Sequence, residues 1–148
     1  MTGLVTTRAV GRAAARAGIE AAIAQAEAID CRCCVAVVDP GGHVVSYDRM
    51  DGAPIQSAQH ARDKAVSAAG NGLATNEMWS SVADTPQLRS GVLKVAGLSI
   101  LGGGVPVRLG GELVGAVGVS GSCGMEEDHA LAETAIAAIL RAVDEAIP

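Results

Sequence analysis

The chain has very few aromatic side chains. Its 148 residues include no phenylalanine, one tyrosine (Tyr47) and one tryptophan (Trp79). Hydrophobic residues still make up 49% of the chain, so alanine, valine, leucine and isoleucine must fill the core. Each small side chain buries little area, and burial contributes only about 25 cal/mol per Å². This composition favours one small domain over residues 1–148 that gains further burial by forming a homo-oligomer.

Positive charge is also scarce, with 11 lysines and arginines against 16 acidic residues. No basic stripe interleaved with aromatic residues is present to follow a phosphate backbone, which excludes a nucleic-acid partner. No uninterrupted apolar run approaches the roughly 20 residues that span a bilayer. The alanine-rich stretch from Val10 to Ala28 is broken by charged residues, unlike a signal peptide. We therefore expect no membrane partner and a cytoplasmic location.

Three of the four cysteines, Cys31, Cys33 and Cys34, lie within four residues, and Cys123 stands alone. This spacing argues against a zinc site, and we assign no metal. In a reducing compartment we expect free thiols. Cys33 and Cys34 fit small core positions, whereas Cys31 is either a core residue or a reactive thiol.

The first half of the chain predicts a helix followed by a hairpin. Small apolar residues recur with charged residues at helical spacing from Thr7 to Ile29. The stripe expected on one side of this helix is Ala13, Ala17, Ala21, Ala24 and Ala28. Residues 33–38 predict a strand buried on both faces, residues 39–42 (DPGG) a turn, and residues 43–47 the returning strand.

The second half predicts helices, then strands, then a closing helix. A helix is expected from Pro54 to about Ala69, followed by short helical turns or a flap from Leu73 to Val95. Residues 98–101, 105–109 and 113–120 predict three strands, and residues 126–147 the last helix. This order predicts an α+β fold: a single antiparallel sheet of about five strands flanked by helices.

Several strings in this order resemble one family. They are VDPGGH at 38–43, RMDGA at 49–53, Lys64-Ala65, GGGVPV at 102–107, GAVGVSG at 115–121 and Asp128. Together they resemble the GlcG/HbpS-like family, which includes heme-binding sensors and the C-terminal domain of PduO-type cobalamin proteins. The resemblance implies a five-stranded antiparallel sheet, homo-oligomers from a dimer up to an octamer, and heme or a corrinoid-like molecule as ligand. The chain departs from the PduO-type domain in having no histidine before His43.

The middle helix carries the first candidate site residues. His60 and Lys64, with Ser57 and Ser67, share one helical face beside a stripe of alanines. If His60 and Lys64 face a cavity, each lowers the pKa of the other, which suits a neutral imidazole as base or ligand. The alternative is a solvated helix face.

Two loops supply further candidates. Arg49 is able to hold a ligand carboxylate, with Asp51 orienting a partner, or the two close the loop as an ion pair. Gly103 and Gly104 either cradle an anion with their N–H groups or let a helix or another subunit approach closely. Glu126 to His129 offer metal-type donors, but acids in a first helical turn are typical partners of the helix dipole.

Two functional hypotheses follow. In the first, an oligomer binds heme or another flat molecule, with His60 as donor and Met50 or Met78 as weaker alternatives. In the second, a cofactor-free enzyme acts on a small carboxylated intermediate. There His60 is the general base, Lys64 an electrostatic partner, Arg49 the carboxylate clamp, and Gly103 and Gly104 the oxyanion donors. A structural partner of another protein is a third possibility. Both site hypotheses require these residues to converge on one enclosed place.

Overall fold

The computed structural model describes residues 3–146, and these form five helices and four strands. The first half contains α1 (Arg12–Ala28), β1 (Cys33–Val38), β2 (Val44–Arg49) and α2 (Ser57–Asn71). The second half contains α3 (Thr75–Val82), α4 (Pro86–Val92), β3 (Gly104–Leu109), β4 (Glu112–Gly121) and α5 (Met125–Glu145). The predicted end of the last helix at Ile147 lies outside the described residues.

The strands form one antiparallel sheet in the order β2-β1-β4-β3. β1 lies in the middle, paired with β2 on one side and β4 on the other, and all six of its residues are buried. This confirms the α+β class, the antiparallel sheet and the strand predicted to be buried on both faces.

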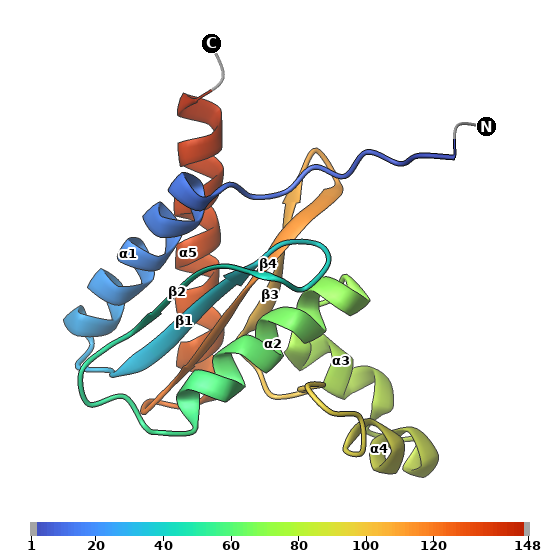
Figure 1. Ribbon diagram of the computed structural model, residues 1–148. Coiled ribbons are helices and arrows are strands. Elements are labelled where there is room, and N and C mark those ends of the chain that lie inside the picture. Colours follow the sequence, from blue (N-terminus) through green and yellow to red (C-terminus); the bar gives the residue numbers. More distant parts are fainter. Residues whose placement is uncertain (1–2, 147–148) are drawn as a thin grey trace.

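Helices cover both faces of the sheet (Figure 1). α1 and α5 pack side by side on one face, with the larger core cluster between them and the sheet, and α2 covers the other face. α3 and α4 continue from α2 as an arm that projects away from the sheet. α4 buries none of its residues, so the arm has almost no core of its own.

The face of α1 that packs is not the predicted alanine stripe. The buried residues are Ala14, Ala15, Gly18, Ile19, Ala22 and Ala26, whereas Ala13, Ala24 and Ala28 are exposed. The cause is the contact between α1 and α5. A Cβ on Gly18 would lie 2.8 Å from the Ala135 carbonyl oxygen and 2.6 Å from Ile139 Cγ1. Only glycine allows the two helices to approach this closely, and Gly18 therefore sets which face turns inward.

The sheet has four strands rather than about five, because residues 98–101 do not form a strand. Side chains, not a neighbouring strand, satisfy their backbone. The Ser99 N–H donates to Ser67 Oγ (2.7 Å), and Thr75 Oγ1 donates to the Leu101 carbonyl (2.6 Å). The segment is thus held against α2 and α3, and its apolar residues reflect that packing.

The structure also corrects the prediction of four free thiols. Cys31 and Cys123 form a disulfide across 92 residues of sequence, with a Cα–Cα distance of 5.7 Å. Cys33 and Cys34 are free and buried, as expected of small core residues. The spacing of the cysteines gave no sign of this pair, because β4 brings Cys123 to the start of β1 only in the folded sheet, where Gly121 pairs with Cys33.

Candidate functional site

Lys64 lies inside the protein rather than on a solvated face. Its side chain is 2% exposed, although its stem starts on α2. The Nζ donates to Asp128 Oδ2 at 2.7 Å and to the Val119 carbonyl at 2.9 Å. Lys64 therefore connects α2 to β4 and to the first turn of α5. Its role in these contacts is structural.

Asp128 shares this burial, with a side chain 5% exposed. Burial raises the pKa of Asp128 above its usual value, while the hydrogen bond and charge of Lys64 act against the rise. From the sequence, Asp128 belongs to the strings that resemble the family and is expected to interact with the helix dipole. The pair joins residues 64 positions apart, so no local pattern identifies it.

Gly103 and Gly104 do meet Lys64. A Cβ on Gly103 would lie 3.1 Å from Lys64 Nζ, and one on Gly104 would collide with the Lys64 carbonyl oxygen. The Gly104 N–H donates to Thr75 Oγ1 at 3.0 Å. These contacts correspond to the predicted close approach of a helix, and they engage one of the two amides that an anion cradle would need.

His60 is exposed on α2, and it is not enclosed with the glycines. The buried side of the helix comprises Ser57, Ala61, Lys64, Ala65, Ser67, Ala68 and Ala69. His60 and Lys64 thus differ sharply in environment although they are one turn apart. Of the residues predicted for the site, Lys64, Gly103 and Gly104 lie together, and His60 is not among them.

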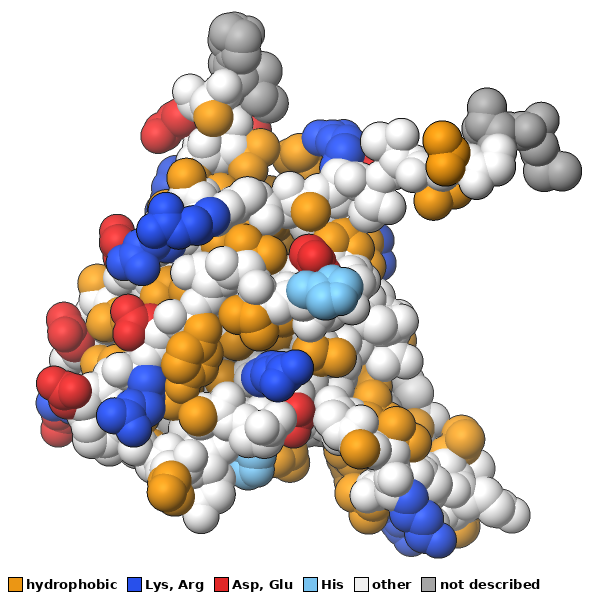
Figure 2. Space-filling model, viewed as in Figure 1, with side chains coloured by type: hydrophobic (Ala, Val, Ile, Leu, Met, Phe, Trp, Pro, Cys, Tyr) orange, Lys and Arg blue, Asp and Glu red, His pale blue; other side chains and the backbone are white. Residues whose placement is uncertain are grey.

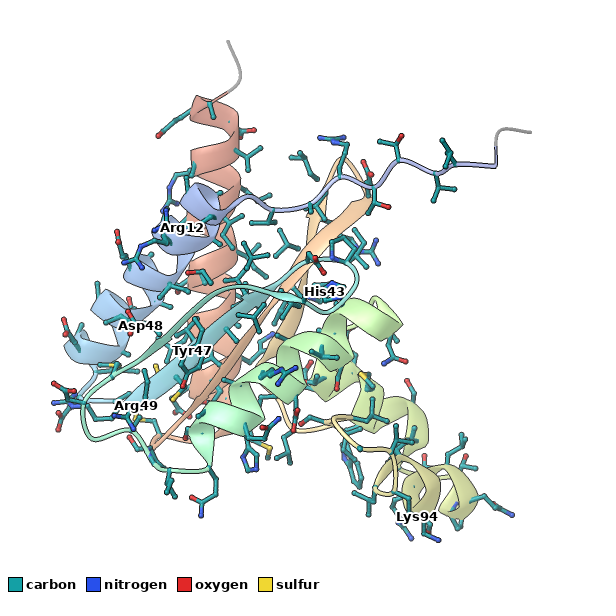
Figure 3. All side chains as sticks on the ribbon, in the orientation of Figure 1. Arg12, His43, Tyr47, Asp48, Arg49 and Lys94 are labelled. Carbon is teal, nitrogen blue, oxygen red and sulfur yellow. A yellow bond between two sulfur atoms is a disulfide. The ribbon has the colours of Figure 1, made fainter. Side chains whose placement is uncertain are left out.

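Arg49 and Asp51 line a different, polar depression of about 500 Å³ between the end of α1 and the end of β2. Figure 3 shows Tyr47, Asp48 and Arg49 along β2, on the opposite side of α2 from the arm that carries Lys94. Met50 also lines this depression, but it is buried and its Sδ accepts a hydrogen bond from the Cys33 N–H at 3.4 Å. Its sulfur is therefore engaged inside the core.

A larger cavity, of about 580 Å³, lies between α3, residues 100–102 and the start of α5. Most of its wall is apolar, and the residues that line it are Asn76, Trp79, Ile100, Leu101, Gly102, Met125, Glu126 and His129. Three of the large exposed hydrophobic side chains, Trp79 (45%), Leu101 (43%) and Met125 (55%), belong to this wall. Exposed apolar side chains gathered around a concave surface indicate a binding site.

His129 gives this cavity a possible donor. It lies one turn after Met125 on α5, so both side chains share a helical face. His129 Nε2 is 3.4 Å from Glu133 Oε1, and Nδ1 is buried without a hydrogen-bond partner within residues 3–146. Nearly all buried polar atoms in proteins are paired, so this nitrogen is an unusual feature at the edge of a cavity. From the sequence, His129 is one of four metal-type donors between Glu126 and His129, and no place in a cavity is assigned to it.

A family model described as "Haem degrading protein HbpS-like" matches residues 10–137. The chain belongs to this HbpS-like family. It is 38% identical, over 84% of its length and 87% of the relative's, to an uncharacterized 15.0 kDa protein from the dhaT-dhaS intergenic region of Citrobacter freundii. The resemblance to the GlcG/HbpS-like family is thereby confirmed.

Two solved structures share the HbpS-like fold. The ORFY protein of Klebsiella pneumoniae has a TM-score of 0.88 and 32% identity, covering 95% of this chain and 97% of that one. A PduOC:heme complex has a TM-score of 0.79 and 31% identity, covering 88% of this chain and 94% of that one. Among residues 3–146, no helix is both long and apolar enough to cross a membrane.

Proposed function

We propose that this HbpS-like protein binds a flat, largely apolar ligand in the cavity between α3 and α5, and that heme is the ligand to test first. The observation that carries the proposal is the cavity itself. Its volume falls within the range of about 300–1,000 Å³ that small-ligand sites occupy. Its apolar wall carries few polar groups, which is the usual composition of such sites.

The residues of the cavity fit heme. Protein donors to heme iron include histidine and methionine, and the cavity wall contains His129 and Met125. The ring of His129 is 25% exposed, with Nε2 held 3.4 Å from Glu133 Oε1, so it could turn toward an iron at the cavity wall. Trp79 offers an aromatic surface for stacking on a flat ring. Bound heme would contribute its redox chemistry, while the protein would orient it and exclude water from one of its faces.

The site predicted from the sequence receives less support. An enzyme using His60, Arg49 and the glycines would need these groups around one substrate. His60 is exposed, Arg49 lines the separate depression near β2, and the Gly104 amide is bonded to Thr75. The arrangement therefore does not favour the cofactor-free enzyme.

Titration with hemin tests the proposed site. We expect the wild-type protein to shift the Soret band and to quench the fluorescence of Trp79, which is the only tryptophan and lines the cavity. His129→Ala is expected to weaken hemin binding about tenfold or more, because the iron loses its donor. His60→Ala is the matched control and should bind hemin like the wild type, since its ring lies outside the cavity wall.

Iron-free protoporphyrin separates the two contributions to binding. It should quench Trp79 equally in the wild type and in His129→Ala, because stacking and apolar packing need no iron donor. Loss of hemin binding in His60→Ala with His129→Ala unaffected would transfer the site to α2. An unshifted Soret band in all three proteins would remove heme as the ligand.

We further propose that the arm mediates self-association, in line with the predicted homo-oligomer. Figure 2 shows hydrophobic side chains gathered on the arm, and Leu88 (51%), Leu93 (73%) and Val95 (56%) are among the exposed ones. Burying them against another copy would compensate for the small core of the arm.

The double variant L88D/L93D tests this second proposal. We expect it to sediment as a smaller species than the wild type in analytical ultracentrifugation, because a charge in a buried apolar contact is strongly unfavourable. Ile55→Asp serves as a control, since Ile55 is 83% exposed and lies before α2, outside the arm. A wild-type protein that is monomeric at all concentrations would contradict the proposal.

A further inference from the structure

The disulfide joins two turns that lie on the same edge of the fold. Cys31 follows α1 and is buried, whereas Cys123 lies in the exposed turn between β4 and α5. Two hydrogen bonds beside it connect the same turns. The Ser122 N–H donates to the Arg32 carbonyl (3.0 Å), and the Arg32 N–H donates to Ser122 Oγ (3.1 Å). The turns thus stay adjacent even without the covalent bond.

The turn that Cys123 occupies leads directly into the wall of the cavity. Met125 and Glu126 line the cavity at the start of α5, two and three residues beyond the disulfide. The helix begins at Met125, and the N-cap residue before it, Gly124, has no side chain to cap the helix. Met125 packs against Gly102, and the first hydrogen bond from the described part of α5 to another element is the one that Asp128 accepts from Lys64. Between residues 123 and 128, the covalent anchor is therefore the disulfide.

The other two cysteines are placed so that they do not rearrange the bond. Cys33 lies near Cys31 in the same core cluster, but burial raises the pKa of its thiol to about 12. A protonated thiol does not attack a disulfide, because the thiolate is the nucleophile. Cys34 belongs to the core cluster on the α2 face of the sheet. A reagent from solvent therefore reaches the disulfide from Cys123, which is exposed, and not from Cys31, which is buried.

We propose that the Cys31–Cys123 disulfide is a reversible redox latch that holds the first turn of α5 in place and thereby sets the affinity of the adjacent cavity. The part that concerns affinity rests on the proposed function. Three observations make the latch reversible: an accessible sulfur, two turns that remain bonded through Ser122 and Arg32, and a neighbouring thiol that stays protonated. In the cytosol, disulfides are usually transient or redox-sensing, and a latch of this kind suits that role.

The chemistry balances with a small dithiol as reductant. One thiolate attacks Cys123 Sγ, the S–S bond breaks, and Cys31 leaves as a thiolate that takes up a proton. The second thiol of the reductant then attacks the mixed disulfide and releases Cys123. The reductant becomes a cyclic disulfide, and two electrons pass to the protein as two thiols. A disulfide oxidant such as oxidised glutathione reverses the exchange.

Thiol titration and amide hydrogen exchange test the latch directly. The denatured wild-type protein should show two thiols after treatment with oxidised glutathione and four after treatment with dithiothreitol. Reduction should speed exchange at the amides of residues 128–130 about tenfold and leave residues 135–139 unchanged. Asp128 is the first residue whose amide bonds within α5, so these amides depend on the first turn, which loses its anchor. Reoxidation should restore the slow rates. Cys123→Ser should exchange quickly in both buffers, and Cys34→Ala should respond like the wild type.

Hemin titration of the oxidised and reduced proteins tests the consequence for the cavity. We expect reduction to weaken binding about tenfold, a coupling of ordinary size. Equal affinity in both forms would overturn the control of the cavity. Four thiols in oxidising buffer, or unchanged exchange at residues 128–130, would overturn the latch itself. If neither form binds hemin, the proposed function fails, while the exchange measurement still decides whether the latch exists.

Discussion

Replacing Lys64 by methionine is expected to lower the free energy of unfolding by about 3–5 kcal/mol, the range for breaking a buried ion pair. Methionine preserves most of the stem that packs beneath α2, so the loss comes from the ammonium group. Without it, Asp128 is left buried without its counter-charge, and the Val119 carbonyl loses a donor. Urea denaturation followed by far-ultraviolet circular dichroism measures the change.

The chain offers a matched control for this substitution. Lys94, its only other lysine, is exposed just beyond α4, and Lys94→Met should change stability by less than about 0.5 kcal/mol. The double variant K64M/D128L should recover much of the loss, because replacing a buried pair by apolar residues is often close to neutral. A Lys64→Met protein as stable as Lys94→Met would show that the pair does not tie α2 to α5.

Much of the architecture was predictable because local sequence patterns determine where its helices and strands begin and end. β1 has the predicted bounds, since a run of buried β-branched and small residues ending at a DPGG turn is unambiguous. α5 begins within one residue of its predicted start. Residues 98–101 were harder, because a short apolar run looks the same whether it pairs with a strand or packs against side chains. Only the contacts with Ser67 and Thr75 distinguish the two.

The candidate site was less predictable because it depends on long-range contacts. Lys64 looked like a partner for His60, yet Asp128 holds its Nζ, and this partner comes from the far end of the chain. The cavity wall combines α3, residues 100–102 and α5, three segments with no shared motif. One signal was available: Met125 and His129 are four residues apart, which places both side chains on one face of the last helix. Because the acidic residues of that turn were interpreted as partners of the helix dipole, this spacing was not used to predict a site.

Substituting a glycine of the sheet is also expected to lower the stability of the protein strongly. Gly118 on β4 pairs directly with Gly104 on β3, and α2 packs against the sheet at these two strands. A Cβ on Gly118 would collide with the Ala61 carbonyl oxygen and lie 2.6 Å from the Ala65 nitrogen. Both are backbone atoms of a helix, so no rotamer change relieves the contact.

Gly118→Ala is therefore expected to lower the free energy of unfolding by about 3 kcal/mol, at the upper end of the usual cost of overpacking. The added methyl group must push α2 away from the sheet, and this also stretches the bond from Lys64 to Val119. Gly70→Ala provides the contrast within α2: its Cβ would meet nothing within 4 Å, and the change should stabilise the protein by up to about 1 kcal/mol through helix propensity. Urea denaturation of the wild type, Gly118→Ala and Gly70→Ala measures these changes in stability. If Gly118→Ala were as stable as the wild type, α2 would not rest on the sheet as closely as these contacts require, and the burial of Lys64 would lose its basis.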